Sequence, residues 1–364
     1  EHTEGGLHDV LQLALELARK AEGRTSPNPM VGAVIVRDGK VIGSGYHRKA
    51  GKAHAEVEAL NSLSDKSLAK GSTMYVNLEP CRHYGRTGPC TKAIIDAGIS
   101  RLVAAMKDPN PQSNGRGFRE LRKAGIEVVT GVMEPEAKKL NEAFSKWVKT
   151  KKPFVTLKAA MSLDGKIATG MGHSKWISSI KSRRYVHEMR NRADALIVGL
   201  NTVLKDNPRL TCRIRGGKNP VKVILDSSLR IPLDSPTLKK GSVFIATTRR
   251  YRRKKKVLLE RMGVGVIVVG GSIRKVDLGK LMGELSIRGI TSVMIEGGSE
   301  VYASAFREGI IDKVVYFIAP KIIGGRGAKP VIGGKGPANV GDALNLRDVI
   351  IRQMDNDVVV EGYI

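Results

Sequence analysis

Apolar residues recur at helical spacing near the start of the chain and then alternate with polar ones along short segments. Apolar side chains three or four positions apart predict an amphipathic helix over residues 7–21. Two strands are expected at 32–37 and 40–45, because Asp38-Gly39 between them is typical of a two-residue hairpin turn. The first elements are therefore a helix and a β-hairpin.

Further along, short apolar runs of strand length alternate with helical segments, a pattern that predicts α/β layers. The helices expected next lie at 53–63, 90–97 and 117–125, and the strands at 73–78, 101–106 and 127–130. Later strands are expected at 154–160, 194–199, 221–225, 242–247, 264–269 and 292–296, with antiparallel strands at the C-terminal edge at 313–319, 347–354 and 357–363.

A Lys-rich stretch that ends at Pro153 separates the two halves of this pattern. We therefore expect two domains, residues 1–150 and residues 151–364, the second of them doubly wound. No internal repeat relates the halves, so they are expected to perform different tasks.

Composition narrows the class of protein. Apolar residues make up 41% of the chain, as in ordinary globular proteins, which excludes wholesale disorder. No run reaches the roughly 18 apolar residues of a membrane span, and residues 1–6 are acidic and polar rather than a secretion signal. Only three cysteines occur, which argues against a disulfide scaffold. We expect a cytoplasmic protein that does not bind membranes.

The net charge of +27 leaves several explanations open. The densest basic stretch, residues 249–256, is most simply a solvated loop that leads into a helix. A basic field also attracts nucleic acid, and it steers small phosphorylated substrates equally well. Charge alone does not choose among these three.

Four residues of the first domain form a pattern typical of zinc hydrolases. His54 and Glu56 stand two apart at an expected helix start, and Cys81 and Cys90 each follow a proline, with Cys90 opening another helix. One imidazole and two thiolates would bind zinc and leave its fourth position to water. A helix N-terminus also lowers a cysteine pKa and so favours the thiolate at Cys90.

The carboxylate completes the chemistry. Two thiolates offset the charge of zinc, so its water is acidified less and a nearby base is useful. Glu56 can take the proton of that water and deliver it to the leaving ammonia, as in nucleobase deaminases. A His-x-Glu pair or two cysteines alone would be weak support, but together, in this order, they strongly indicate a catalytic zinc site. A purely structural zinc site is the main alternative.

The second domain lacks the G-x-G-x-x-G of a standard Rossmann site. An expected strand instead leads into Glu296-Gly297-Gly298-Ser299, a Gly-rich turn that opens a helix. Free backbone N–H groups and the helix dipole there can hold a pyrophosphate. Ordinary strand-to-helix loops often carry such a turn, so this feature is weak by itself.

Several longer stretches resemble one known family, the bifunctional deaminase-reductases of riboflavin biosynthesis. In the first domain the matching residues are Pro27-Asn28-Pro29-Met30-Val31-Gly32, the segment His54-Ala55-Glu56-Val57-Glu58-Ala59-Leu60, the stretch Leu78 to Cys90, Asp108-Pro109-Asn110-Pro111 and Gly115-Arg116-Gly117. In the second they are Lys158 to Lys166, Ser174 to Ser178, Gly199 to Pro208 and Leu225-Asp226-Ser227. The long spacing between the two cysteines is this family's own pattern.

The resemblance implies a cytidine-deaminase-like three-layer α/β/α domain followed by a dihydrofolate-reductase-like α/β domain. It implies hydrolytic deamination, by a zinc-activated hydroxide, of 2,5-diamino-6-ribosylamino-4-pyrimidinone 5'-phosphate. It then implies NADPH-dependent reduction of the ribosyl group to ribityl, so the cofactors are Zn²⁺ and NADPH. The partner is a small phosphorylated pyrimidine rather than a nucleic acid, and a homo-oligomer, dimer or tetramer, is expected.

Site residues follow from the same resemblance. Glu56 is the catalytic proton shuttle and the zinc ligands are His54, Cys81 and Cys90. The NADPH site comprises Ala160, Trp176, Thr202, Asp206, Ser227, Gly298, Ser299, Glu300, Val301, Tyr302, Ala303 and Ser304. The substrate contacts are Ser174, Arg190, Leu210, Arg213 and Glu296 in the second domain, and Asn28, His47 and His83 in the first.

Some of these residues have simpler explanations. Asn28 in its proline-flanked turn could be buried for structural reasons, Trp176 could be a half-buried core aromatic, and either arginine could be a solvated surface residue. Two other functions also compete with the enzyme pair. One is a nucleic-acid-editing deaminase, which the reductase-like half disfavours. The other is a non-catalytic zinc module, which Glu56 disfavours.

Overall fold

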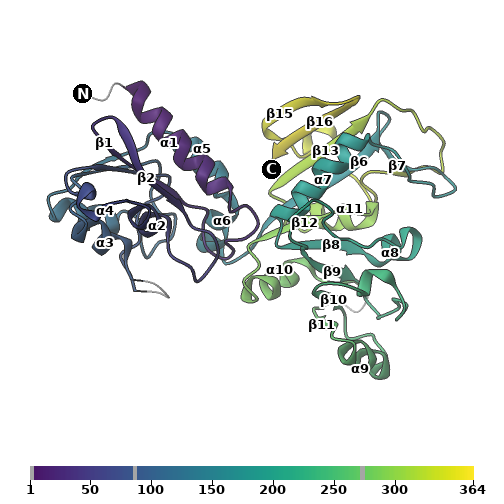
Figure 1. Ribbon diagram of the computed structural model, residues 1–364. Coiled ribbons are helices and arrows are strands. Elements are labelled where there is room, and N and C mark those ends of the chain that lie inside the picture. The colour runs from purple at the N-terminus through teal and green to yellow at the C-terminus, as the bar shows by residue number, and fades with distance from the viewer. Residues whose placement is uncertain (1–3, 85–87, 271–274) are drawn as a thin grey trace. The chain divides into compact units, whose positions relative to one another are not determined.

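The computed structural model describes residues 4–84, 88–270 and 275–364. The chain divides into two compact units, with the boundary after Lys151 (Figure 1). The acidic start, residues 1–3, and Gly85, Arg86 and Thr87 of the family-like stretch lie outside the described residues. Within the described parts of the chain, no helix combines the length and apolar character that a bilayer span requires.

The first unit is built on a five-stranded sheet with the order β2-β1-β3-β4-β5. Its strands are β1 (Gly32–Arg37), β2 (Lys40–Tyr46), β3 (Thr73–Val76), β4 (Arg101–Ala104) and β5 (Glu127–Thr130). β1 pairs antiparallel with β2 and β3, and the remaining pairs are parallel. Asp38 and Gly39 both have positive φ, so the predicted hairpin turn is confirmed.

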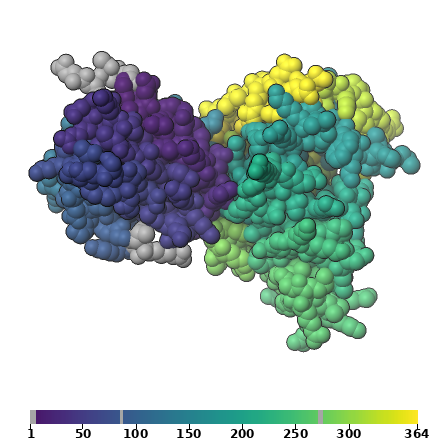
Figure 2. Space-filling view, in the orientation of Figure 1, coloured from purple at the N-terminus to yellow at the C-terminus, as the bar shows by residue number. Residues whose placement is uncertain are grey.

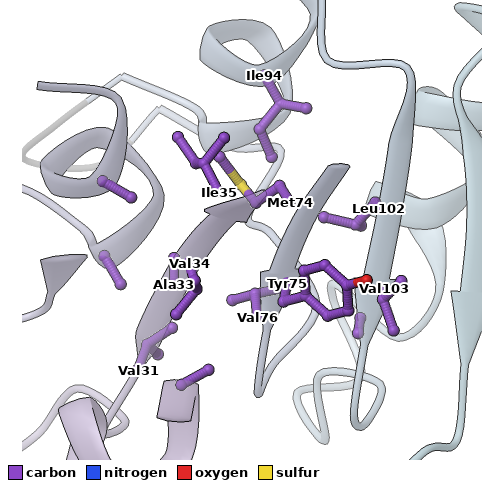
Figure 3. Packing of buried hydrophobic residues seen from close by; sticks show 14 of the residues in the cluster. Val31, Ala33, Val34, Ile35, Met74, Tyr75, Val76, Ile94, Leu102 and Val103 are labelled. Carbon is purple, nitrogen blue, oxygen red and sulfur yellow. The ribbon is translucent and has the colours of Figure 1, made fainter. Parts of the chain in front are cut away.

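Helices cover both faces of this sheet. They are α1 (Glu4–Arg19), α2 (Ala55–Asn61), α3 (Cys90–Asp96), α4 (Arg116–Lys123), α5 (Glu134–Leu140) and α6 (Glu142–Thr150). On β1, a Cβ at Gly32 would lie 2.1 Å from the Ala14 carbonyl of α1. Ile35 lies three residues after Gly32, so its side chain points to the opposite face of the sheet. There it lies beside Met74 of β3 and Ile94 of α3 (Figure 3). The expected three-layer α/β/α arrangement is confirmed.

Two helices of the first unit were not predicted. α5 and α6 follow one another after β5, and each buries few side chains, mainly Ala137 in α5 and Val148 in α6. Helices this short with a single buried position carry little periodic pattern, and α5 also starts behind Met133 in the left-handed region. They occupy residues 134–150, for which the sequence predicted no element.

The second unit contains a nine-stranded sheet with the order β11-β10-β9-β8-β12-β6-β13-β16-β15. Its strands are β6 (Phe154–Ser162), β8 (Ala195–Gly199), β9 (Val221–Leu225), β10 (Val243–Thr247), β11 (Gly265–Val268), β12 (Ser292–Ile295), β13 (Lys313–Ala319), β15 (Arg347–Met354) and β16 (Asp357–Tyr363). β13 runs parallel to β6, and the antiparallel pairing begins with β16. A small separate pair joins β7 (Lys166–Ala168) and β14 (Lys329–Pro330).

Helices between these strands position the residues of interest. They are α7 (Ile180–Arg192), α8 (Leu200–Asp206), α9 (Arg253–Arg261), α10 (Leu278–Ile287) and α11 (Ser299–Arg307). The carboxyl ends of the parallel strands β8, β9 and β12 open onto α8, the turn after β9, and α11. Ligands of open α/β sheets bind at such carboxyl ends. The predicted doubly wound second domain is confirmed.

Candidate active sites

Three ligand-type side chains meet in the first unit. His54 caps the start of α2, Cys81 follows β3, and Cys90 is the first residue of α3. Their ligand atoms all lie within 4.8 Å of one another, with His54 Nδ1 3.2 Å from Cys90 Sγ and 3.4 Å from Cys81 Sγ. Two ligands on one tetrahedral zinc are about 3.5 Å apart, given the usual Zn–N and Zn–S bond lengths. The cluster therefore fits zinc.

The charges of this cluster also fit a cation. The hydrogen bond from the Cys90 thiol lowers the pKa of Cys81 to about 4, while the same bond and burial raise the pKa of Cys90. Glu56, only 3% exposed, bonds to Cys90, and burial raises the pKa of Glu56 to about 7. Two sulfurs and a carboxyl packed so closely cannot all ionise unless a metal offsets their charge.

Two of the three expected substrate contacts of the first unit are bonded to each other. Asn28 Nδ2 lies 3.1 Å from His47 Nε2, and His47 Nδ1 lies 3.0 Å from the Ala53 carbonyl. His47 is buried, burial lowers its pKa, and its ring packs edge-on 5.3 Å from that of His54. A neutral His47 that donates to Ala53 accepts from the Asn28 amide, so it orients Asn28 beside the cluster. His83 is exposed.

Sequence reasoning missed Glu79, two residues before Cys81. Its buried carboxylate accepts backbone N–H bonds from Asp108 at 3.0 Å, Gly115 at 2.7 Å and Gly117 at 2.8 Å. A Cβ at Gly117 would come within 2.3 Å of the Pro80 carbonyl, so the start of α4 rests directly on the cysteine-bearing loop. Both glycines belong to the family-like stretches, but nothing in the sequence connects them to Glu79.

The second unit contains a cavity of about 1160 Å³ at the carboxyl ends of its parallel strands. All the residues predicted for NADPH and substrate in this unit line it, except Ala303, which is buried within α11. Such a volume exceeds the upper range of ordinary small-molecule pockets and suits a dinucleotide together with a second ligand.

The start of α11 carries a group suited to a phosphate. Ser299 opens this nine-residue helix, and its hydroxyl is buried without a hydrogen-bond partner in the described part of the chain. The preceding Gly298 lies close to the Thr202 hydroxyl of α8, where a Cβ would be 3.3 Å away. An unused buried hydroxyl at a helix N-terminus fits the pyrophosphate of NADPH.

Arg190 and Glu296 form a buried ion pair in this cavity. Arg190 donates from Nε and Nη2 to the two Glu296 oxygens at 2.7 and 2.6 Å, and from Nη1 to the Thr211 carbonyl at 3.0 Å. Burial would raise the pKa of Glu296, but the guanidinium outweighs it and keeps that pKa low. All three nitrogen atoms of the Arg190 guanidinium therefore already donate hydrogen bonds to other groups of the protein.

Two other cavity residues escaped sequence reasoning. Lys158 on β6 is half-buried in the cavity near Glu296, and desolvation lowers its pKa. His187 on α7 contacts Arg213. Lys158 lay within a quoted family-like stretch but had no pattern of its own, and a single histidine on a helix gives no indication of its partner.

Comparisons with known proteins cover the whole chain. Residues 153–360 match the family described as "RibD C-terminal domain", and residues 6–106 match the "cytidine and deoxycytidylate deaminase zinc-binding region". A protein of Aquifex aeolicus named "Riboflavin biosynthesis protein RibD" is 46% identical over 97% of both chains. The protein of that name from Escherichia coli is 37% identical over 95% of this chain and 96% of its own.

Solved structures give the same picture. A diaminohydroxyphosphoribosylaminopyrimidine deaminase/5-amino-6-(5-phosphoribosylamino)uracil reductase of Thermotoga maritima superimposes with a TM-score of 0.88 at 38% identity, covering 100% of this chain and 99% of its own. RibD of Acinetobacter baumannii gives 0.89 at 35% identity, with 99% of both chains covered. The similarity therefore extends over both units.

Proposed function

This chain belongs to the RibD family of riboflavin-biosynthesis proteins, and we propose that its two units divide the family's two reactions between them. It is a bifunctional enzyme, a zinc-dependent deaminase and an NADPH-dependent reductase. Residues 1–150 carry the deaminase and residues 151–364 the reductase in this proposal. The separate matches at 6–106 and 153–360 support that division.

The substrate of the first unit is 2,5-diamino-6-ribosylamino-4-pyrimidinone 5'-phosphate in this proposal, and the second unit reduces the ribosyl group of the deaminated product to ribityl. The reactions printed for the Thermotoga maritima relative support this assignment. The observation that carries the deaminase is the cluster of His54, Cys81 and Cys90 with Glu56 buried against it.

Within the first unit, His54, Cys81 and Cys90 would hold zinc, which supplies Lewis-acid activation of a water when bound. Glu56 takes a proton from the water and gives it to the leaving amino group. Its carboxyl is buried against the three ligand residues, so it is placed to do both. Asn28, oriented by His47, is placed to contact the pyrimidine, and exposed His83 to contact its phosphate.

Within the second unit, the start of α11 and Ser299 would hold the pyrophosphate of NADPH, and Thr202, Asp206, Ser227, Ala160 and Trp176 would line the rest of its site. Hydride transfer is the cofactor's own chemistry, so these residues bind and orient it. Ser174, Leu210 and the Arg190–Glu296 pair border the substrate. Arg213, an exposed fork at the cavity wall, is the residue we assign to the substrate phosphate.

Removal of the metal tests whether the first unit alone carries the deaminase reaction. After treatment with dipicolinate, ammonia release from the diaminopyrimidine substrate is expected to fall to background. Without zinc, Glu56 has no activated water from which to take a proton. NADPH oxidation with the deaminated intermediate should continue at its original rate. Added Zn²⁺ should restore ammonia release, and metal analysis should then find one zinc per chain. Full ammonia release from metal-free protein would contradict the assignment.

We also propose that the enzyme is a cytoplasmic homo-oligomer. Two metal-ligating cysteines need a reducing compartment, which cell fractionation would test. At the edge of the large sheet, β15 exposes Val349 (48%), Ile350 (40%) and Ile351 (68%), and Figure 2 shows these C-terminal strands, in yellow, on the surface of the second unit. An apolar sheet edge is a natural place for a second copy to pair.

Light scattering would test this pairing. The protein is expected to elute at two or four times the mass of one chain. Ile351→Lys should shift it toward the monomer, because a charge would enter the apolar contact. Ile287→Lys replaces an even more exposed isoleucine (82%) on α10 and should leave the mass unchanged. Equal masses for wild type and Ile351→Lys would exclude β15 as the interface.

A further inference from the structure

The guanidinium of Arg213 hydrogen-bonds to a histidine rather than to a carboxylate. Its guanidinium donates from Nε and from Nη2 to a single acceptor, Nε2 of His187, at 3.2 and 3.1 Å. His187 lies on α7, one turn before Arg190, whereas Arg213 lies in the loop between α8 and β9. These hydrogen bonds therefore join Arg213, an exposed residue of a loop, to helix α7.

The two arginines of this region differ in how their charge is balanced. Arg190 is paired with Glu296 through two short bonds. Arg213 bonds instead to an imidazole, and burial, with the charges of Arg190 and Arg213, lowers the pKa of His187 to about 4. An uncharged ring can accept from Arg213 without neutralising it. Arg213 therefore keeps its full positive charge for an anion.

The geometry of the contact leaves a binding edge free. A guanidinium has five N–H groups, and two edges of it can each bind an anion in two-point fashion. The contact with His187 uses the edge formed by Nε and Nη2. The edge formed by Nη1 and the second N–H of Nη2 is left for a phosphate. The imidazole fixes the plane of the fork, which lowers the entropy lost when the phosphate binds.

We propose that His187 is a positioning residue, an uncharged acceptor that holds Arg213 in the orientation that binds the 5'-phosphate of the reductase substrate. This inference rests on the proposed role of Arg213 in holding that phosphate. It assigns to His187 no contact with the reacting atoms.

The test compares the reductase substrate with its dephosphorylated form. Arg213→Ala is expected to raise the KM of the phosphorylated substrate by roughly 10- to 100-fold, the range for a lost charged hydrogen bond. His187→Leu, which removes the acceptor, should raise it by about 3- to 10-fold because the fork remains but loses its fixed orientation. In both variants kcat, the KM of NADPH and the KM of the dephosphorylated substrate should stay near their wild-type values.

Three further variants sharpen the result. His187→Gln keeps an acceptor at the same reach and should restore most of the affinity. The double variant His187→Leu with Arg213→Ala should be no worse than Arg213→Ala alone, since the histidine acts through the arginine. Arg215→Ala removes the same charge from an exposed position of the same loop and serves as the matched control.

The outcomes separate the two proposals. If Arg213→Ala does not discriminate between the two substrates, the phosphate assignment of Arg213 fails. If Arg213→Ala discriminates and His187→Leu leaves both KM values unchanged, or raises both equally, the positioning role of His187 is overturned. A further loss in the double variant beyond Arg213→Ala would also overturn it, because His187 would then act independently.

Discussion

Replacing Glu56 by Gln is expected to lower the kcat of deamination by about 10³-fold, within the range for loss of a general acid–base group. The amide is nearly the same size, so it should fit the buried site of Glu56 at the start of α2. It cannot accept the proton of the attacking water or deliver one to the leaving amine. Zinc content should be unchanged, because His54, Cys81 and Cys90 remain.

Ammonia release, metal analysis and NADPH oxidation together check this expectation. The variant should still reduce the deaminated intermediate at the wild-type rate, since the reductase residues lie in the other unit. The matched control is Glu58→Gln on the same helix, where the carboxylate pairs with Arg48 at 3.5 Å and is partly exposed. The control should keep deamination within about 3-fold. Equal rates for Glu56→Gln and wild type would rule out the proton role.

The local features of the first unit could be predicted from its sequence. The Asp38-Gly39 turn depends only on two adjacent residues that can adopt positive φ. The zinc cluster was predictable because each of its ligands stands at the start of a helix or after a strand. Each of these depends on chemistry within a few positions of itself. The resemblance added the identity of the reactions and of the cofactors, and the comparisons confirm both.

Long-range pairing could not be predicted in the same way. The apolar pattern of β13 gives a strand but not its direction, and the structure pairs it parallel to β6 and antiparallel to β16. The family resemblance likewise implied the same role, a substrate contact, for Arg190 and Arg213. The structure distinguishes the two arginines. Glu296, more than a hundred residues after Arg190, occupies the guanidinium of Arg190, whereas His187 leaves one edge of the Arg213 guanidinium free. Such partners are set by the fold.

Glu79 is the clearest case of a role fixed by distant backbone, and its replacement carries the second large expected effect. Glu79→Ala should lower the free energy of unfolding of the first unit by at least about 3 kcal/mol, because three backbone N–H groups lose a charged acceptor and buried donors left unsatisfied cost about 1–3 kcal/mol each. Those donors, on Asp108, Gly115 and Gly117, fasten the loop before α4 to the cysteine-bearing loop.

Urea denaturation can follow the first unit separately, because the chain has two tryptophans and only Trp147 lies in that unit. In a Trp176→Phe background, the Trp147 fluorescence transition should move to a clearly lower urea concentration in Glu79→Ala. Glu134→Gln, which loses a half-exposed pair with Lys138 on α5, should shift it by no more than about 0.5 kcal/mol. Deamination should fall as well, since Glu79 stands two residues before Cys81 and its loss loosens a ligand of the zinc. A wild-type transition in Glu79→Ala would show that those N–H groups find other acceptors, and the carboxylate would then not be what joins the two loops.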